Sequence, residues 1–193
     1  MGRPAKFSSE QILDTTAQLV AEGGPDFATV GGIAERLGAP TGSIYHRFDS
    51  RDLLLARLWV RTARRAQEGF LVALSQDDVQ QAALDAALHV PRWSRSNLND
   101  ACVLILYRRE QLAKQWPEEL GDDLATLNAP IKAATRSFIR RRFGSFTKAN
   151  LDVTSFALVD VPLGAVRRYL VTGRPPPLSV DDLVARTCRC ILG

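Results

Sequence analysis

Cysteine and histidine are scarce in this chain, which has only three Cys and two His among its 193 residues. Cys102, Cys188 and Cys190 form an odd set, so a framework of disulfides is not expected, and Cys188-x-Cys190 is not a zinc-binding spacing. Sparse Cys residues of this kind are typical of a reducing compartment. We therefore expect reduced thiols in a cytoplasmic protein, with no metal site and no cofactor.

Long apolar runs and catalytic motifs are also missing from the sequence. No segment approaches the roughly 20 uninterrupted apolar residues of a membrane span, and the N-terminus lacks the apolar stretch of a signal peptide. There is no Gly-rich phosphate loop, no nucleophile elbow and no paired His and carboxylate signature. We expect neither an enzyme nor a membrane protein, and we assign no catalytic residue.

An excess of positive charge is missing from the N-terminal part of the chain. The whole chain has a formal net charge of +4 and a pI of about 9.2, which is compatible with nucleic-acid binding. Residues 1–60, however, contain six Lys or Arg and seven Asp or Glu, a net charge of −1. A DNA-binding segment there has to be recognised from the position of particular side chains.

Helix signals are frequent and no run alternates as a strand should, so an all-α fold is expected. Ser8 is placed to cap a first helix, with Gln11 reaching back to it, and Gly23 ends that helix. Thr29 is placed to cap a second helix, which Gly38 ends. Tight turns therefore separate the first helices of the chain.

The remaining sequence predicts more helices. A third is expected over about 41–48, and a fourth, capped by Asp49 or Ser50, from about 51 to about 74. Arg140, Arg141 and Arg142 come just before the helix stop Gly144, where we prefer a solvated helix terminus to a second nucleic-acid patch. The later helices are expected near 77–95, 98–114, 117–143, 147–172 and 179–192.

The expected helix at 41–48 has too little apolar surface for a helix that only packs. Ile44 and Phe48 would face a small core, and the other side is short and polar. A helix-turn-helix protein places such a helix in the major groove of DNA, braced by the helix before it. The side chains available to base edges or phosphates are Thr41, Ser43, Tyr45, His46 and Arg47, with Arg51 at the start of the next helix.

Residues 8–55 resemble the DNA-binding domain of the TetR/AcrR family of regulators. The resemblance rests on the capped first helix, on Thr29-Val30-x-x-Ile33-Ala34-x-x-Leu37-Gly38 and on Gly42-Ser43-Ile44-Tyr45-x-x-Phe48. It implies an all-α fold of about nine helices. It also implies an N-terminal three-helix helix-turn-helix domain over 1–55 and a C-terminal ligand-binding and dimerisation domain over 56–193.

The resemblance further implies which residues contact double-stranded DNA. Two departures from the family pattern affect this surface: Pro40 stands where a Ser or Thr cap is common, so Thr41 is expected to cap instead, and Gly31-Gly32 replaces a polar pair. An arm containing Arg3 enters the minor groove or is a disordered tail, and both interpretations stay open. The implied phosphate contacts are Thr29, Tyr45 and Arg51, and Thr41, Ser43, His46 and Arg47 lie nearest the bases; Gly42 also belongs to the implied DNA-binding set.

Residues 76–146 contain scattered large and polarisable side chains from which a mostly apolar ligand pocket could be built. We expect an apolar or aromatic small-molecule effector there, centred on Trp93, Tyr107 and Phe138. Taken singly, each of these residues is more simply a core residue. The candidate ligand-binding residues are His89, Trp93, Cys102, Leu106, Tyr107, Trp116 and Phe138.

The last two helices lie over about 147–192: the first is apolar over much of its circumference, and the second has one broad apolar face. Two-fold pairing into a four-helix bundle would bury these surfaces, and a homodimer matches a palindromic operator. The alternative is that both helices only cap the core of one chain. The expected function is a dimeric, ligand-responsive regulator, usually a repressor, released from its operator by a small molecule; a DNA-binding module without a ligand is the alternative.

Overall fold

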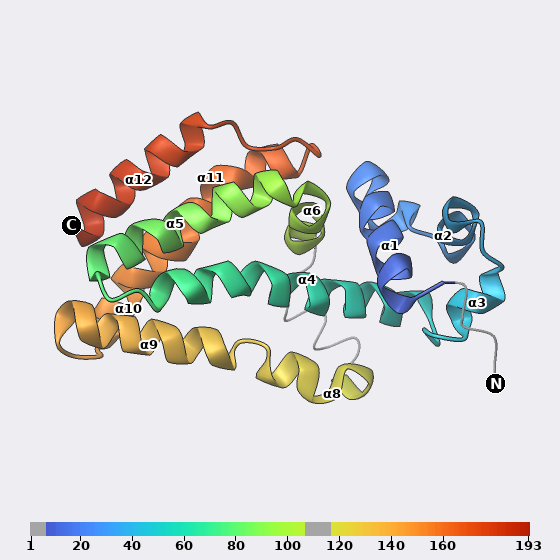
Figure 1. The fold of residues 1–193 in the computed structure, drawn as a ribbon, viewed down its shortest axis with the longest axis horizontal. Coiled ribbons are helices and arrows are strands. Elements are labelled where there is room, and N and C mark those ends of the chain that lie inside the picture. Colours follow the sequence, from blue (N-terminus) through green and yellow to red (C-terminus); the bar gives the residue numbers. More distant parts are fainter. Residues whose placement is uncertain (1–6, 107–116) are drawn as a thin grey trace.

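The computed structural model describes residues 7–106 and 117–193, and the regular structure within these ranges is helical. The predicted all-α fold is confirmed, with a helix-turn-helix unit at the N-terminal end followed by a helical domain. Figure 1 shows the two parts joined by one long helix, α4. Arg3 and the end of the helix predicted over 98–114 lie outside the described residues.

The N-terminal unit consists of α1 (Ser9–Gly23), a single 3-10 turn (Pro25–Phe27), α2 (Val30–Leu37) and α3 (Thr41–Tyr45). The predicted capping box is present, because the N–H of Gln11 donates to Ser8 Oγ (3.1 Å) and the N–H of Ser8 donates to Gln11 Oε1 (2.8 Å). Gly38 ends α2 with φ of +61°, a left-handed conformation that favours glycine. The predicted starts and stops of the first two helices are confirmed.

Helix α4 (Arg51–Leu74) is 24 residues long and belongs to two hydrophobic cores. Ser50 caps it by accepting a hydrogen bond from the N–H of Leu53 (3.0 Å). Its first half, including Leu54 and Leu58, is buried with α1 and α2, and its second half, including Phe70, is buried in the helical bundle. The predicted extent of this helix is confirmed.

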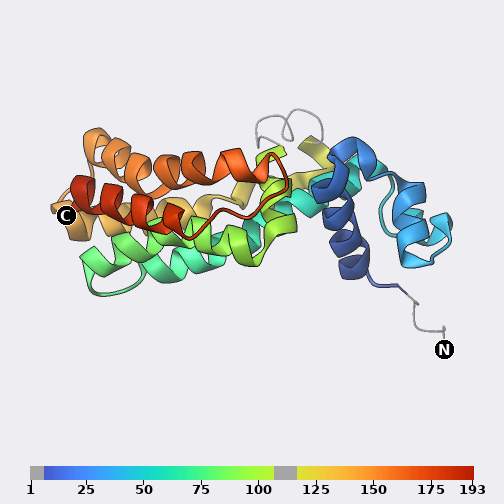
Figure 2. The same ribbon diagram turned by 90° about the horizontal axis from the view of Figure 1, so that it is seen from above.

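The helical bundle encloses the second half of α4. Figures 1 and 2 show α5 on one side of α4, α8 and α9 on the other, and α11 and α12 covering α5. The bounds are α5 Val79–Ser96, α6 Leu98–Leu106, α8 Pro117–Thr126, α9 Ala129–Phe143, α10 Lys148–Ser155, a π-helical turn Phe156–Asp160, α11 Val161–Leu170 and α12 Ser179–Leu192.

Two sequence expectations about helix length are wrong. The single helix predicted over 117–143 is divided into α8 and α9, because Pro130 has no N–H to donate to the carbonyl of Thr126. The third helix ends at Tyr45, although the N–H of Phe48 still donates to the carbonyl of Ile44 (3.0 Å).

Lys148–Leu170 form one continuous 23-residue helix that passes through the π-helical turn. By length and composition alone this helix is long and apolar enough to cross a membrane. One such helix is weak evidence for a membrane span, because the core helix of a soluble protein passes the same test. Here Leu158 and Val166 are buried in the second core, against the rest of the bundle. The π-helical turn comes just before Pro162, which cannot donate the regular helical hydrogen bond to Leu158.

The three consecutive Arg residues at the end of α9 are not all solvated, contrary to expectation. The Arg141 guanidinium donates to the carbonyl of Leu74, the last residue of α4, and to the carbonyl of Gln76 just beyond it. The Arg142 guanidinium donates to the carbonyl of Leu192 at the end of α12 (2.8 and 3.1 Å). Both cations therefore satisfy the last carbonyls of other helices, where the helix dipole favours positive charge.

An ionic cluster joins α1, α4 and α6 where the two parts of the molecule meet. Arg61 Nη1 lies 2.9 Å from Glu10 Oε2 and 2.8 Å from Asp14 Oδ1, and Arg61 Nη2 lies 3.8 Å from Asp100 Oδ1. Arg65 adds contacts with Glu10 (3.0 Å) and Asp100 (3.5 Å). The side chains of Arg61 and Asp100 are each 12% exposed, so this ionic cluster is partly shielded from water.

Replacing Arg61 with Met should lower the free energy of unfolding by about 2 kcal/mol, because three carboxylates lose a shared cation. This value lies between the losses that are typical of exposed and of buried ion pairs. The matched control is Arg64→Met, since Arg64 pairs at the surface with Asp123 (2.6 Å). That change should cost less than about 1 kcal/mol. Urea unfolding measures both, and equal losses would contradict the role given to the cluster.

Candidate nucleic-acid interface and ligand cavities

Helix α3 lies at the end of the molecule that is farthest from the bundle (Figure 1). Ile44 and Phe48 are buried in the first core, as predicted, and hold the helix against α1 and α2. The outer side carries Thr41, Gly42 and His46, all exposed, and Tyr45, which is 52% exposed. The structure thus brings four of the predicted contact residues together on one polar surface.

Pro40 precedes α3 without a side-chain cap, and its carbonyl accepts from the N–H of Ser43 (2.9 Å). The expectation that Thr41 caps the helix is therefore wrong, because Thr41 is the first helical residue. Ser43 is half-buried, and its carbonyl accepts a hydrogen bond from Arg47 Nη1 (3.2 Å). This contact keeps the half-buried Arg47 guanidinium beside α3.

Thr29 and Arg51 flank this surface from the neighbouring helices. Thr29 is exposed and caps α2, accepting from the N–H of Gly32 (3.0 Å). Arg51 donates through Nε to the carbonyl of Ala28 (2.9 Å) and through Nη2 to the carbonyl of Pro25. Arg51 therefore joins the start of α4 to the loop before α2, a structural contact that the sequence did not predict.

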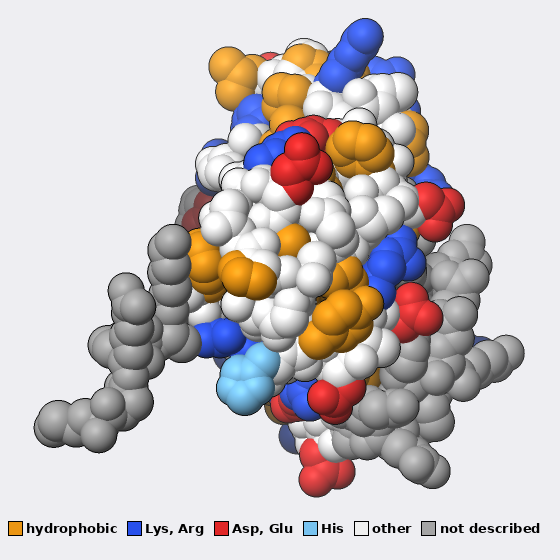
Figure 3. Space-filling view, turned by 90° about the vertical axis from the view of Figure 1, so that its right-hand side faces the viewer, with side chains coloured by type: hydrophobic (Ala, Val, Ile, Leu, Met, Phe, Trp, Pro, Cys, Tyr) orange, Lys and Arg blue, Asp and Glu red, His pale blue; other side chains and the backbone are white. Residues whose placement is uncertain are grey.

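The electrostatics of this end of the molecule are mixed in sign. Figure 3 shows Lys and Arg side chains interspersed with Asp and Glu on the described part of this face. Arg36 is paired with Glu22 (2.8 Å), and its hydrogen bond lowers the pKa of the Glu22 carboxyl. Recognition of an anionic partner here depends on individual side chains and N–H groups rather than on bulk charge.

His89 joins α5 to α4 in the bundle. Its Nε2 lies 2.7 Å from the carbonyl of Ala66, so we assign the ring proton to this nitrogen as the donor. Gly69 leaves the space for the ring, because a Cβ at that position would overlap it. Burial lowers the pKa of His89 below its ordinary value, and the hydrogen bond to Ala66 opposes that effect.

The remaining predicted ligand residues are only partly brought together. His89 and Trp93 line one small cavity of about 80 Å³. Cys102 is buried with its Sγ 3.4 Å from the carbonyl of Leu170, and burial raises the pKa of its thiol. Phe138 is fully buried in the second core. Tyr107, Trp116 and the side chain of Leu106 lie outside the described part of the structure.

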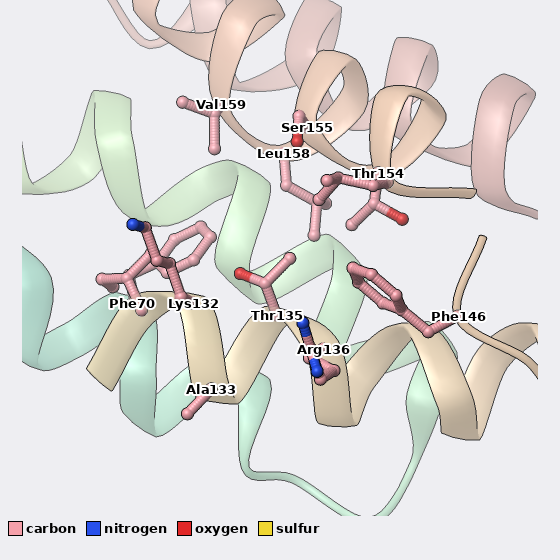
Figure 4. Close-up of a pocket in the computed structure, with 12 residues that line it drawn as sticks. Phe70, Lys132, Ala133, Thr135, Arg136, Phe146, Thr154, Ser155, Leu158 and Val159 are labelled. Atoms are coloured by element: carbon pink, nitrogen blue, oxygen red, sulfur yellow. The ribbon is translucent and has the colours of Figure 1, made fainter. Parts of the chain in front are cut away.

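A larger cavity, of about 600 Å³, lies between α9 and the helix formed by α10 and the π-helical turn (Figure 4). Sequence reasoning did not find its residues, although Thr154, a polar residue on a largely apolar helix, was an available signal. Among the described residues no group of three or more His, Cys, Asp or Glu side chains could hold a metal ion. The apolar part of the lining is Phe70, Ile131, Phe146, Leu151, Leu158 and Val159.

The stability of the protein should depend on pH through His89. Its folded-state pKa is below the ordinary value of 6.5, so near that pH the unfolded chain binds protons more readily than the folded chain. The contribution of neutral His89 to the free energy of unfolding is therefore fully present above about pH 6.5. It is lost as the pH falls toward the folded-state pKa.

Urea unfolding at about pH 7.5 and about pH 5.5 tests this dependence on wild type and His89→Gln, a variant that does not titrate in this range. Wild type should lose more stability on acidification than the variant does. The same loss in both proteins would show that His89 is not the responsible group.

Comparisons with known proteins agree with this geometry. Residues 12–58 match the family of bacterial regulatory proteins, tetR family. No curated protein matches the chain in sequence.

Several solved structures share the fold over nearly the whole chain. A transcriptional regulator from Rhodococcus sp. Rha1 has a TM-score of 0.72 at 17% identity, with 96% of each chain covered. FadR from Bacillus subtilis, solved in complex with stearoyl-CoA, has a TM-score of 0.69 at 12% identity and covers 96% of this chain and 98% of its own. PfmR from Thermus thermophilus, a TetR family transcriptional regulator, has a TM-score of 0.65 at 21% identity, with 94% and 96% covered.

At these identities the solved structures show a shared fold, and the match over residues 12–58 adds the helix-turn-helix domain. Residues 12–58 are therefore similar to the DNA-binding domain of the tetR family of bacterial regulatory proteins, and the chain as a whole shares the fold of the solved structures.

Proposed function

We propose that the protein is a cytoplasmic homodimer that represses transcription from a palindromic operator and is released by a small-molecule effector. Residues 1–55 form the DNA-binding domain, and residues 56–193 form the domain for ligand binding and dimerisation. The observation that carries the proposal is α3, a helix buried through Ile44 and Phe48 whose outer side is short, polar and exposed.

In this proposal α3 enters the major groove of DNA. Thr41, Ser43, His46 and Arg47 lie nearest the bases, since all four lie along α3 or its last turn. The contacts to phosphates come from Thr29, from Tyr45 and from Arg51, with Gly42 allowing close approach of the backbone.

The homodimer is supported by apolar side chains exposed on neighbouring helices. We define the pairing face as Val153, Phe156, Leu163 and Leu183, which are 39%, 52%, 47% and 56% exposed. The first three follow helical spacing along the continuous helix from Lys148 to Leu170, and the last lies on the adjacent α12. A second copy of this chain would bury these side chains and place two α3 helices on one DNA site.

The response to an effector is supported by cavities in the bundle and by the arrangement of α4. The FadR structure with stearoyl-CoA shows that a protein of this fold binds a small molecule. Because α4 is one continuous helix from the bundle to α3, an effector that shifts its second half moves α3 as well. The effector acts only through a difference in affinity for the two arrangements.

Tyr45→Phe tests the DNA contact with the loss of one hydroxyl. DNA selected by the wild-type protein from a random pool should bind the variant roughly tenfold more weakly, the cost of a hydrogen bond to a charged phosphate. The matched control is Tyr169→Phe, the same change on α11, which should leave the affinity unchanged. Equal effects of the two changes, or failure to enrich any sequence from the pool, would contradict the proposal.

Phe156→Arg tests the pairing face. An unpaired charge at the centre of an apolar interface should convert the dimer to a monomer at micromolar concentration. Val72→Arg is the control, since Val72 is 67% exposed on α4 and lies outside the pairing face. Light scattering after size exclusion measures the mass, and a dimer that persists in Phe156→Arg would refute this interface.

A further inference from the structure

We infer that the 600 Å³ cavity between α9 and α10 binds an anionic amphiphile, an aliphatic chain that ends in a negatively charged head group. The biological role of this binding rests on the proposed function, the response to an effector. Binding itself can be measured without DNA. The volume lies within the range of about 300–1,000 Å³ that is usual for small-molecule sites.

The walls of the cavity are suited to an aliphatic chain. Figure 4 shows Phe70 and Phe146 at opposite ends, with α9 on one side and the helix carrying Leu158 on the other. The lining is mainly apolar along its length, and no Asp or Glu is among the described residues that form it. A chain lying between the two aromatic rings would therefore displace water from apolar surface.

Two cations stand at the edge of the same cavity. Lys132 and Arg136 are one helical turn apart on α9, and both are exposed while lining the cavity. Arg136 lies over the ring of Phe146, 4.6 Å from its centroid. Neither cation forms an ion pair with a described residue, so a carboxylate or phosphate group would find two cationic partners without displacing an internal one.

Thr154 is a buried polar residue in the wall of the cavity. Its side chain lines the cavity and is 1% exposed, yet its Oγ1 has no hydrogen-bond partner among the residues that the structure describes. Such groups are nearly always satisfied in folded proteins, and those that are not require an explanation. This hydroxyl is buried within the wall, so recognition of the head group is assigned to Lys132 and Arg136 alone.

The cavity also touches the π-helical turn. Leu158 and Val159 belong to this turn and line the cavity, whereas Phe156 points from the same turn to the pairing face. π-helical turns occur frequently at functional sites. The side chains of the ligand cavity and of the pairing face thus alternate on one helix.

Calorimetric titration without DNA tests the inference. The probes are dodecanoate and dodecanoyl-CoA, each below its critical micelle concentration, and uncharged 1-dodecanol, below its solubility limit. The variant is Lys132→Met/Arg136→Met. The matched control is Arg140→Met/Lys148→Met, which removes two exposed cations outside the cavity. Wild type and control should bind at least one anionic probe about tenfold more tightly than 1-dodecanol, and the cavity variant should lose that preference.

Binding of dodecanoate alone, or of dodecanoyl-CoA alone, supports the inference and identifies the source of the head group. Equal affinity of wild type for 1-dodecanol and both anions, unchanged binding by the cavity variant, or no binding of any probe would overturn it. Binding that leaves the DNA affinity unchanged would keep the cavity assignment and reject only the proposed effector response.

Discussion

Helix α4 contributes buried side chains to two hydrophobic cores along one uninterrupted run of 24 residues. Leu54 and Leu58 fix its first half against the helix-turn-helix unit, and Phe70 and Leu74 fix its second half in the bundle. Its two ends are also secured, by the Ser50 cap and by the Arg141 guanidinium. The position of α3 relative to the bundle therefore depends on a rigid helix rather than on a flexible linker.

The continuous helix from Lys148 to Leu170 combines two proposed roles in a similar way. One side, with Thr154 and Leu158, lines the large cavity, and the other side, with Phe156 and Leu163, forms the pairing face. Opposite sides of one helix cannot be displaced independently, because packed helices move as units. An occupant of the cavity would act on the dimer through this helix and on α3 through α4.

Local features of the fold were predictable from the sequence, and distant contacts were not. The caps at Ser8, Thr29 and Ser50 follow from hydrogen bonds that span three residues. Arg51 and Arg142 instead reach carbonyls 23 to 50 residues away, for which the sequence carries no periodic signal. A tertiary structure is needed to find such partners.

The large cavity escaped prediction for a related reason. Aromatic and polarisable side chains directed the sequence analysis to His89 and Trp93. The volume of a cavity depends on how closely neighbouring helices pack, and hydrophobic periodicity carries no information on that. The surface of α3 was easier to find, because Tyr45 and His46 are exposed beside the buried Ile44 on a helix of five residues and its following turn. A short helix with one buried anchor and a polar outer side is typical of a helix that enters a DNA groove.

Photocrosslinking from the outer side of α3 tests most directly whether this helix enters a DNA groove. The protein would carry Tyr45→benzoylphenylalanine and be bound to a DNA site selected by the wild type, with Tyr169→benzoylphenylalanine as the control. If α3 of each protomer enters the major groove, position 45 crosslinks at two symmetric places, separated by about one helical turn of DNA or a multiple of it. Crosslinks from position 169 but not from position 45 would contradict this placement of α3.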